Sequence, residues 1–234
     1  MPDMANLIIT IDGPAASGKS TVARRLAERL DASFLDTGAM YRAVTLAAMQ
    51  AGVAMNDEEE LLSVLDNRKF EFAIKQGKMA VCIDGVDVTE QIRGLEVTAN
   101  ARHIASAAKI RENLVQMQRQ VAAEEGKIVA EGRDQGTVAF PNADIKFYLT
   151  AKLIERARRR QAELRAKGGG ESLEGSLEKI QRAIEARDKS DESRAVGPLR
   201  PAGDAVVIDT TNLSIEEVVE KVLCCVKEKC LRKD

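Results

Sequence analysis

The feature that most constrains this chain is a glycine-rich segment at residues 13–20, which matches the pattern G-x-x-x-x-G-K-[ST]. A continuous apolar run at residues 7–11 precedes it and is typical of a buried strand. Apolar residues at helical spacing follow, from about Lys19 to Leu30. A strand, a glycine-rich turn and a helix in this order predict a phosphate-binding loop in an α/β protein.

The residue types in this loop suit the binding of a nucleoside triphosphate. Glycines let the backbone wrap closely and point successive N–H groups at phosphate oxygens, and the positive end of the following helix faces the same anion. Lys19 is expected to reach the β- and γ-phosphates, and Ser20 to offer its hydroxyl to Mg²⁺. The predicted ATP-binding residues of this segment are Gly13, Pro14, Ala15, Ala16, Ser17, Gly18, Lys19, Ser20 and Thr21.

The amino-acid composition disfavours several classes of binding partner. Charged residues make up 31% of the 234 residues, yet the net charge is only -2, which argues against general nucleic-acid binding. Tryptophan is absent and aromatic residues amount to 3%, so a stacking platform for single strands is also disfavoured. The apolar run at residues 7–11 is too short for a signal peptide or a membrane span. Composition thus argues against nucleic-acid and membrane partners and leaves small anionic ligands open. We expect a cytoplasmic protein that is a monomer.

The nucleophile and metal chemistries that depend on histidine or cysteine find little support. His103 is the only histidine and has no partner motif for a Ser-His-Asp or Cys-His site. The four cysteines lack zinc-ligand spacing and are expected to be reduced packing residues.

Strands and helices are expected to alternate along most of the chain. Further strands are predicted at residues 33–35, 127–130, 145–149 and 205–208. Helices are predicted at residues 39–51, 95–125, 153–167, 173–189 and 215–229. This alternation predicts a parallel sheet covered on both faces. Residues 69–88 differ, because two short strands flank a turn at residues 75–78, which predicts an inserted antiparallel meander.

Two charged clusters follow predicted strands, where ligands bind in open α/β sheets. In residues 36–42, Thr37 and Arg42 could hold a second anion, although Arg42 could equally be a solvated helix residue. In residues 131–134, Glu131 is suited to hold Mg²⁺ through water and Arg133 adds a positive charge; the alternative is a charged turn.

Two predicted helices carry concentrated arginines. The first holds Arg156, Arg158, Arg159 and Arg160. The second holds Arg187 and Asp191, and Arg194 shares their helix face if the helix persists that far. A glycine break at residues 168–170 between them suits a mobile lid that closes over phosphates. The alternative is a surface hairpin linked by salt bridges.

Five stretches together resemble bacterial cytidylate kinases over nearly the whole chain: residues 9–20, 35–42, 131–141, 187–194 and 209–214. The resemblance implies a P-loop NTPase-type three-layer α/β/α fold with a central parallel sheet. It implies a single domain whose core comprises residues 1–66, 127–152 and 203–234. An inserted monophosphate-binding lobe would span about residues 67–126, and a helical lid about residues 153–190.

The resemblance also implies transfer of the γ-phosphoryl group of ATP to CMP or dCMP, with Mg²⁺. It implies that Arg111 and Asp134 read the cytosine edge. The residues it implies for CMP are Thr37, Arg42, Arg111, Arg133, Asp134, Arg187, Asp191 and Arg194. The lid residues over ATP would be Arg156 and Arg160, and the metal ligands Ser20 and Glu131. Catalytic roles would fall to Lys19, Arg133 and Arg160, with no side-chain nucleophile and no essential general base.

One position departs from the family pattern. Arg102 stands where the family usually places a small hydroxyl residue that helps to read the base, and Ser106 follows one turn later. Either another residue of this chain corresponds to that family position, or this enzyme reads its base differently.

Three rival functions remain to be compared. A kinase for AMP, UMP or shikimate would share the loop and lid but would not need the insertion or the pairing of Arg111 with Asp134. A GTPase-like switch should carry an Asn-Lys-x-Asp motif, which the sequence lacks. A non-catalytic nucleotide-binding module should lack the loop lysine or the second set of arginines, and both are present.

Overall fold

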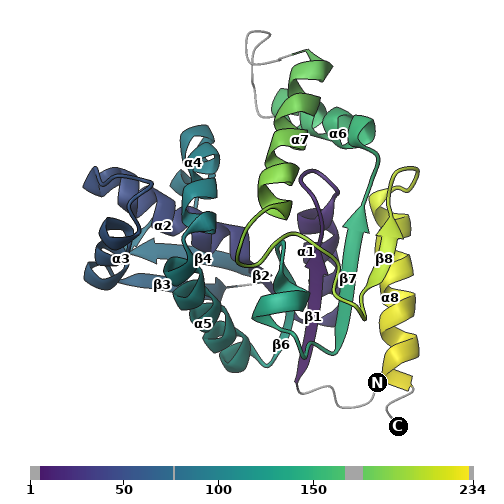
Figure 1. Ribbon diagram of the computed structural model, residues 1–234. Coiled ribbons are helices and arrows are strands. Elements are labelled where there is room, and N and C mark those ends of the chain that lie inside the picture. Colours follow the sequence, from purple (N-terminus) through teal and green to yellow (C-terminus); the bar gives the residue numbers. More distant parts are fainter. Residues whose placement is uncertain (1–5, 76, 167–175, 232–234) are drawn as a thin grey trace. The chain divides into compact units, whose positions relative to one another are not determined.

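The structure is a computed structural model that describes residues 6–75, 77–166 and 176–231 (Figure 1). The predicted glycine break at residues 168–170 therefore lies outside the described residues. The chain divides into two compact units. One comprises Met1–Ile9 and Ala27–Gly132, and the other Thr10–Leu26 and Arg133–Asp234.

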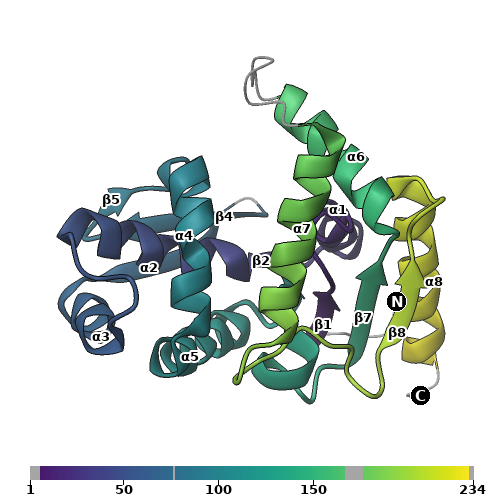
Figure 2. The ribbon, with the colours of Figure 1, turned by 45° about the horizontal axis from the view of Figure 1, so that its top comes forward.

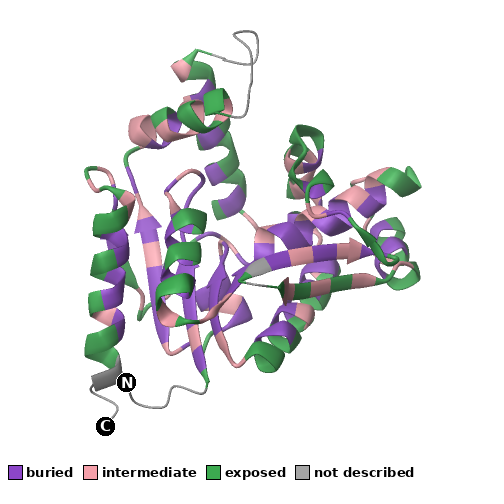
Figure 3. Cartoon of the chain, turned by 180° about the vertical axis from the view of Figure 1, so that it is seen from behind, coloured by how far each residue is buried: buried purple, intermediate pink, exposed green. Residues whose placement is uncertain are grey.

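The five-stranded central sheet has the strand order β2-β6-β1-β7-β8 (Figure 1). Its strands are β1 (Leu7–Asp12), β2 (Ser33–Asp36), β6 (Lys127–Glu131), β7 (Ile145–Thr150) and β8 (Val206–Asp209). Strand β2 pairs in parallel with β6, and β7 in parallel with β8. The interior strands are largely buried, as the purple ribbons of Figure 3 show. The predicted α/β fold with a central parallel sheet flanked by helices is confirmed.

The first unit surrounds β2 and β6 with helices and adds a second sheet. Helix α5 contacts both strands, and α2 packs against α4. The second sheet is antiparallel with the order β3-β4-β5, so the predicted meander is confirmed and gains a short third strand. The elements of this unit are α2 (Thr37–Ala51), α3 (Glu58–Asn67), β3 (Phe70–Lys75), β4 (Lys78–Ile83), β5 (Val86–Asp87), the 3₁₀ turn η1 (Gln91–Arg93), α4 (Leu95–Ser106) and α5 (Ala108–Glu125).

Three details of this unit correct the sequence prediction. Helix α3 was not predicted. The segment at residues 95–125 is two helices, because Ala107 adopts an extended conformation with φ -77° and ψ 111°. Helix α2 begins at Thr37 rather than residue 39, because the Asp36 side chain caps it by accepting a hydrogen bond from the Ala39 amide at 2.9 Å.

The second unit carries the glycine-rich loop and the arginine-bearing helices. Helices α6 and α7 pack side by side, and α8 contacts β7 (Figures 1 and 2). Helix α1 matches its predicted bounds, whereas α7 begins at Leu177 and ends at Glu192, each later than predicted. The elements here are α1 (Lys19–Leu30), whose last turn enters the first unit, the π-helical turn η2 (Gln135–Ala139), α6 (Leu153–Ala166), α7 (Leu177–Glu192) and α8 (Ile215–Leu231). Within the described part of the chain, no helix combines the length and apolarity needed to cross a membrane.

Candidate active site

The loop at residues 13–20 joins β1 to α1 within the second unit, as predicted. Its shape requires glycine at its start, because Gly13 has φ +147° and a Cβ there would lie 2.0 Å from the Leu149 carbonyl oxygen. Ala16 and Gly18 also have positive φ, at 58° and 93°. This succession of turns bends the backbone into the compact curve that an anion-binding loop needs.

The lysine of the loop pattern is held inside the curve. Lys19 is only 4% exposed, and its Nζ donates a hydrogen bond to the Pro14 carbonyl oxygen at 2.7 Å. Ser20 and Thr21 follow in the first turn of α1 and are exposed. The ammonium group thus lies across the loop while the neighbouring hydroxyls face outward, a donor set that suits a polyphosphate.

The arginines of α6 are placed differently from one another. Arg156 is buried and paired with Asp188 of α7, whereas Arg160 is partly exposed and paired with Glu163 on its own helix at 3.1 Å. Arg159, to which the sequence analysis assigns no role, donates from Nη2 to the Thr210 carbonyl oxygen at 2.6 Å and from Nη1 to the Thr210 hydroxyl oxygen at 3.0 Å.

Thr210 in turn donates a hydrogen bond to the Ser17 carbonyl oxygen at 3.2 Å, and so links Arg159 of α6 to the glycine-rich loop.

In the first unit, Thr37 and Arg42 lie on the first turns of α2. The Thr37 hydroxyl donates to the Glu131 carbonyl oxygen at 2.7 Å, which ties α2 to the end of β6. Arg42 Nη2 donates to Asp36 Oδ2 at 3.2 Å. The guanidinium is therefore held over the N-terminus of α2, the end that favours anions.

Arg111 of α5 is also fixed in the first unit. It is 2% exposed, its Nη1 donates to the Ala105 carbonyl oxygen at 3.2 Å, and its Cζ lies 5.4 Å from the centroid of the Tyr41 ring. Stacking over an aromatic ring orients the planar guanidinium. Arg102, by contrast, is an exposed residue of α4 whose Nε donates a hydrogen bond to His103 Nε2 at 3.4 Å.

In the second unit, Asp191 joins two of the predicted arginines. Its Oδ2 accepts from Arg133 Nε at 2.9 Å, and its Oδ1 accepts from Arg194 Nη2. Arg194 lies beyond the end of α7 at Glu192, so the helix does not persist to it as the shared-face prediction required. The three residues are brought together by ion pairing instead, and Arg187 is exposed on α7.

Asp12, which ends β1, is a buried residue that sequence reasoning missed. Its Oδ1 accepts from the Gln135 amide at 2.9 Å and its Oδ2 from the Gly136 amide at 2.8 Å, at the start of η2. Burial raises the pKa of Asp12 to about 7, against these two hydrogen bonds, which lower it. Asp134 directly precedes η2, is 3% exposed, and accepts from the Val138 amide through its carbonyl oxygen at 2.8 Å. The Asp12 carboxylate therefore fixes the turn that carries Asp134.

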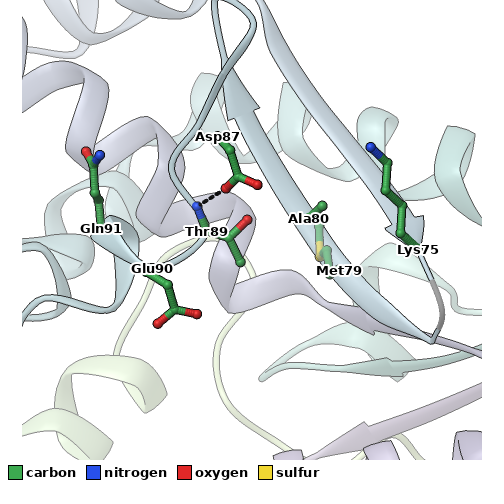
Figure 4. Close-up of a pocket in the computed structure, with 7 residues that line it drawn as sticks. All are labelled: Lys75, Met79, Ala80, Asp87, Thr89, Glu90 and Gln91. Carbon is green, nitrogen blue, oxygen red and sulfur yellow. Dashed lines mark hydrogen bonds between the residues drawn. The ribbon is translucent and has the colours of Figure 1, made fainter.

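A separate shallow hollow lies on the small antiparallel sheet (Figure 4). The Asp87 carboxylate accepts a hydrogen bond from the Thr89 amide at 2.8 Å at its wall. None of the predicted site residues lines it. The lining residues are Lys75, Met79, Ala80, Asp87, Thr89, Glu90 and Gln91.

Comparison with known proteins gives a consistent result. Residues 9–228 match the family model described as cytidylate kinase. A cytidylate kinase of Geobacillus kaustophilus is 48% identical over 221 residues, which cover 94% of this chain and 96% of that protein. A cytidylate kinase of Leuconostoc mesenteroides is 45% identical over 219 residues, with coverages of 94% and 96%. Among solved structures, an uncharacterized protein from Eubacterium ventriosum shares the fold alone, with a TM-score of 0.50 and 13% identity over 95% of this chain and 99% of its own.

Proposed function

The chain belongs to the cytidylate kinase family, and we propose that it transfers the γ-phosphoryl group of ATP to CMP or dCMP, yielding ADP and CDP or dCDP. The continuous family match over residues 9–228 carries this proposal, because that range includes every residue assigned below. We also propose that the enzyme works as a monomer.

The glycine-rich loop is the proposed ATP site. Its backbone amides and the N-terminus of α1 suit the phosphates, and Lys19 is placed by its bond to Pro14 to balance their charge. Arg160 is the proposed lid arginine over ATP, since it is partly exposed and its pairing with Glu163 is a surface pairing that exchanges readily. Arg156 is proposed to serve the same site.

Phosphoryl transfer of this kind ordinarily uses a divalent ion, and the residues present fit Mg²⁺. No group of three or more His, Cys, Asp or Glu side chains able to hold a metal occurs among the described residues, and magnesium needs none, because it takes phosphate oxygens and water. The exposed hydroxyl of Ser20 and, through water, the buried carboxylate of Glu131 are the proposed protein ligands. When bound, the ion would neutralise charge on the phosphate oxygens.

The residues proposed for CMP are those that the resemblance to cytidylate kinases implies. In the first unit, Thr37 and Arg42 suit the acceptor phosphate, and the stacked Arg111 suits the O2 and N3 side of cytosine.

In the second unit, Asp134 suits the N4 amino group of cytosine, because its carboxylate can accept a hydrogen bond from that group. Arg133 and Arg194 are proposed to align the phosphate, and Arg187 and Asp191 to contact the sugar. The shared carboxylate of Asp191 pre-orients both phosphate-binding arginines.

The chemical step asks the protein for position and charge. The acceptor phosphate oxygen attacks the γ-phosphorus in line with the departing ADP oxygen, and charge spreads over the equatorial oxygens. Lys19, Arg133 and Arg160 are the residues proposed to stabilise that charge.

A panel of acceptors tests the proposal. ADP release from ATP and Mg²⁺ is measured with CMP, dCMP, UMP and AMP, and with shikimate as the unrelated acceptor. We expect the highest kcat/KM with CMP or dCMP. Highest turnover with AMP or shikimate would reject the cytosine nucleotide as substrate while leaving the kinase class in place.

The base-reading assignment has its own test. Asp134→Asn replaces one acceptor oxygen with an amide donor that can meet the O4 atom of uracil, so the ratio of kcat/KM for UMP to that for CMP should rise about tenfold. Asp66→Asn, an exposed substitution on α3, is the matched control and should leave this ratio unchanged. An unchanged ratio in Asp134→Asn would remove Asp134 from base recognition.

A further inference from the structure

One residue of the phosphate loop is gripped on both sides of its backbone by the pair of arginine-bearing helices. The Ala15 amide donates to Asp188 Oδ1 of α7 at 3.0 Å. The Ala15 carbonyl oxygen accepts from Arg156 Nη1 of α6 at 3.0 Å. Arg156 Nη1 also donates to the other carboxylate oxygen of Asp188. The three groups close a ring of hydrogen bonds, which we name the Ala15 clamp.

The clamp is buried and its polar atoms are satisfied. The side chains of Arg156 and Asp188 are 10% and 9% exposed. Arg156 Nε makes a further bond to the Ala151 carbonyl oxygen at 3.0 Å, at the start of α6. A buried ion pair that is hydrogen-bonded in this way holds one arrangement, and removing one partner leaves the other charge buried alone. The pair therefore holds α6, α7 and the loop in one relative position.

Apolar packing supports the same arrangement. Ala15 lies in a buried cluster with Ala157 of α6 and with Ile180 and Ile184 of α7. Figures 1 and 2 show α6 and α7 side by side next to the turn between β1 and α1. The tip of the loop thus rests on the helix pair through both polar and apolar contacts, all within the second unit.

The residue that follows the clamp has an unfavourable backbone conformation, which indicates a role for the clamp. Ala16 has φ 58°, a left-handed conformation that costs a non-glycine residue about 1 kcal/mol. Such a conformation persists only where neighbouring contacts enforce it, and residues held this way gather at functional sites. The clamp fixes the peptide that directly precedes Ala16, and the turn at Ala16 sets the direction of the amides that follow in the loop.

We propose that Arg156 and Asp188 are positioning residues of the ATP site, which act on the nucleotide through the Ala15 backbone rather than by touching ATP. This inference rests on the proposed function, since it takes the loop to be the ATP site. It gives Arg156 a different task from the one expected of a lid arginine. It also makes the affinity for the adenine nucleotide depend on a carboxylate of α7 that lies between two residues assigned to CMP, Arg187 and Asp191.

The test compares Asp188→Ala and Asp188→Asn with the wild-type chain. Two readouts are taken: hydrogen exchange of the Ala15 amide by NMR, and the separate dissociation constants of ADP with Mg²⁺ and of CMP. Glu185→Gln is the matched control, because Glu185 is an exposed acid on the same helix, paired with Lys189 at 3.3 Å.

In Asp188→Ala we expect the Ala15 amide to exchange faster and the dissociation constant of ADP to rise about tenfold, the scale of one lost hydrogen bond to a charged group. The dissociation constant of CMP should change less than about twofold, within the precision expected for an untouched contact. Asp188→Asn keeps one acceptor oxygen and should give a smaller rise for ADP. Glu185→Gln should match the wild-type chain.

Several results would overturn the inference. Equal losses of ADP and CMP affinity would mean that Asp188 merely holds α7 in place, and unchanged ADP affinity would mean that the loop does not need the clamp. If Asp188→Ala does not fold, Asp188→Asn and Arg156→Lys are judged by the same readouts. A wild-type chain that binds neither nucleotide would reject the proposed function instead, and unchanged exchange at Ala15 would then separately reject the clamp.

Discussion

Single residues set the charge at the proposed ATP site, and Lys19 is the clearest case. Its side chain is buried, and its ammonium group is held by a hydrogen bond to the Pro14 carbonyl oxygen. Lys19 is therefore more firmly positioned than a flexible lysine on the surface would be. Lys19→Ala should lower kcat about a hundredfold or more, the scale for removing one preorganised donor. The circular dichroism spectrum should stay that of the wild-type chain, which shows whether the fold survives.

A matched lysine controls for the loss of charge. Lys221→Ala removes an exposed lysine of α8 and should leave kcat within about twofold, as surface substitutions usually do. A folded Lys19→Ala variant with near-normal kcat would take Lys19 out of the mechanism.

Asp12 gives a prediction for pH. Its pKa in the folded chain is about 7 against an ordinary value of 3.8, so folding takes up a proton between these two values. The contribution of Asp12 to stability is therefore fully present below the ordinary pKa and is lost as the pH rises through about 7. The carboxylate of Asp134 opposes ionisation and the ammonium group of Lys19 favours it, both less strongly than burial.

Chemical denaturation across this pH range checks the prediction. The unfolding free energy of the wild-type chain minus that of Asp12→Asn should fall with rising pH, by at most about 1.4 kcal/mol per pH unit. Titration of the Asp12 carboxyl carbon by NMR should give a midpoint near 7. A carboxyl that is already ionised at pH 4 would contradict the prediction.

Sequence reasoning found the residues that belong to local patterns and missed those that act across the chain. The loop residues 13–20 could be predicted because their spacing is itself the motif. Asp188 and Thr210 could not, because each contacts the loop from more than 170 positions away, and no local pattern records such a bond. Asp12 did carry one indication, an acidic residue that ends a buried strand directly before the loop.

At the scale of elements, the junction between β1 and the loop depends on close contact with β7. Gly13→Ala would place a Cβ 2.0 Å from the Leu149 carbonyl oxygen, at a φ of +147° that side chains rarely adopt. We expect a loss of about 3 kcal/mol or more in unfolding free energy, measured by chemical denaturation. Gly203→Ala is the control, since no heavy atom lies within 4 Å of its added Cβ, and it should change stability by less than about 0.5 kcal/mol. Equal stability of the two variants would show that β7 does not constrain the loop.

In helix α2, a substitution is expected to lower CMP affinity without lowering stability. A Cβ at Gly38 would lie 2.9 Å from Arg42 Nη1, the movable end of a side chain. Gly38→Ala should therefore keep or slightly raise stability, because alanine favours helix, while displacing the guanidinium from Asp36. The KM for CMP should rise about tenfold with little change in the KM for ATP, as a misplaced positioning group predicts. An unchanged KM for CMP would remove Arg42 from acceptor binding.

Most elements could be predicted from periodicity, and the misses have physical causes. Helix α3 was missed although Asp57 caps it, accepting from the Glu59 amide at 2.9 Å, and three acidic residues fill its first turn. The turn η2 has no apolar period of its own. It is held instead by bonds from its first two amides to Asp12, which a local pattern cannot reveal.

At the scale of the whole molecule, alternating strands and helices were enough to predict the parallel sheet. The strand order β2-β6-β1-β7-β8 was not predicted, because the sequence does not state which strands are neighbours. The inserted meander could be predicted because its two strands are adjacent in sequence and pair through a short turn. The split of the chain within β1 and α1 into two compact units depends on contacts between distant segments and has no sequence marker.

The most direct test of the kinase assignment follows the phosphoryl group itself. ATP labelled at its γ-phosphoryl group is mixed with CMP, Mg²⁺ and either the wild-type chain or Lys19→Ala, and the labelled products are separated. We predict that the label moves to CDP with the wild-type chain, one CDP for each ADP formed, and that it moves about a hundredfold more slowly, or slower still, with the variant. Label released as inorganic phosphate, with none in CDP, would contradict the account.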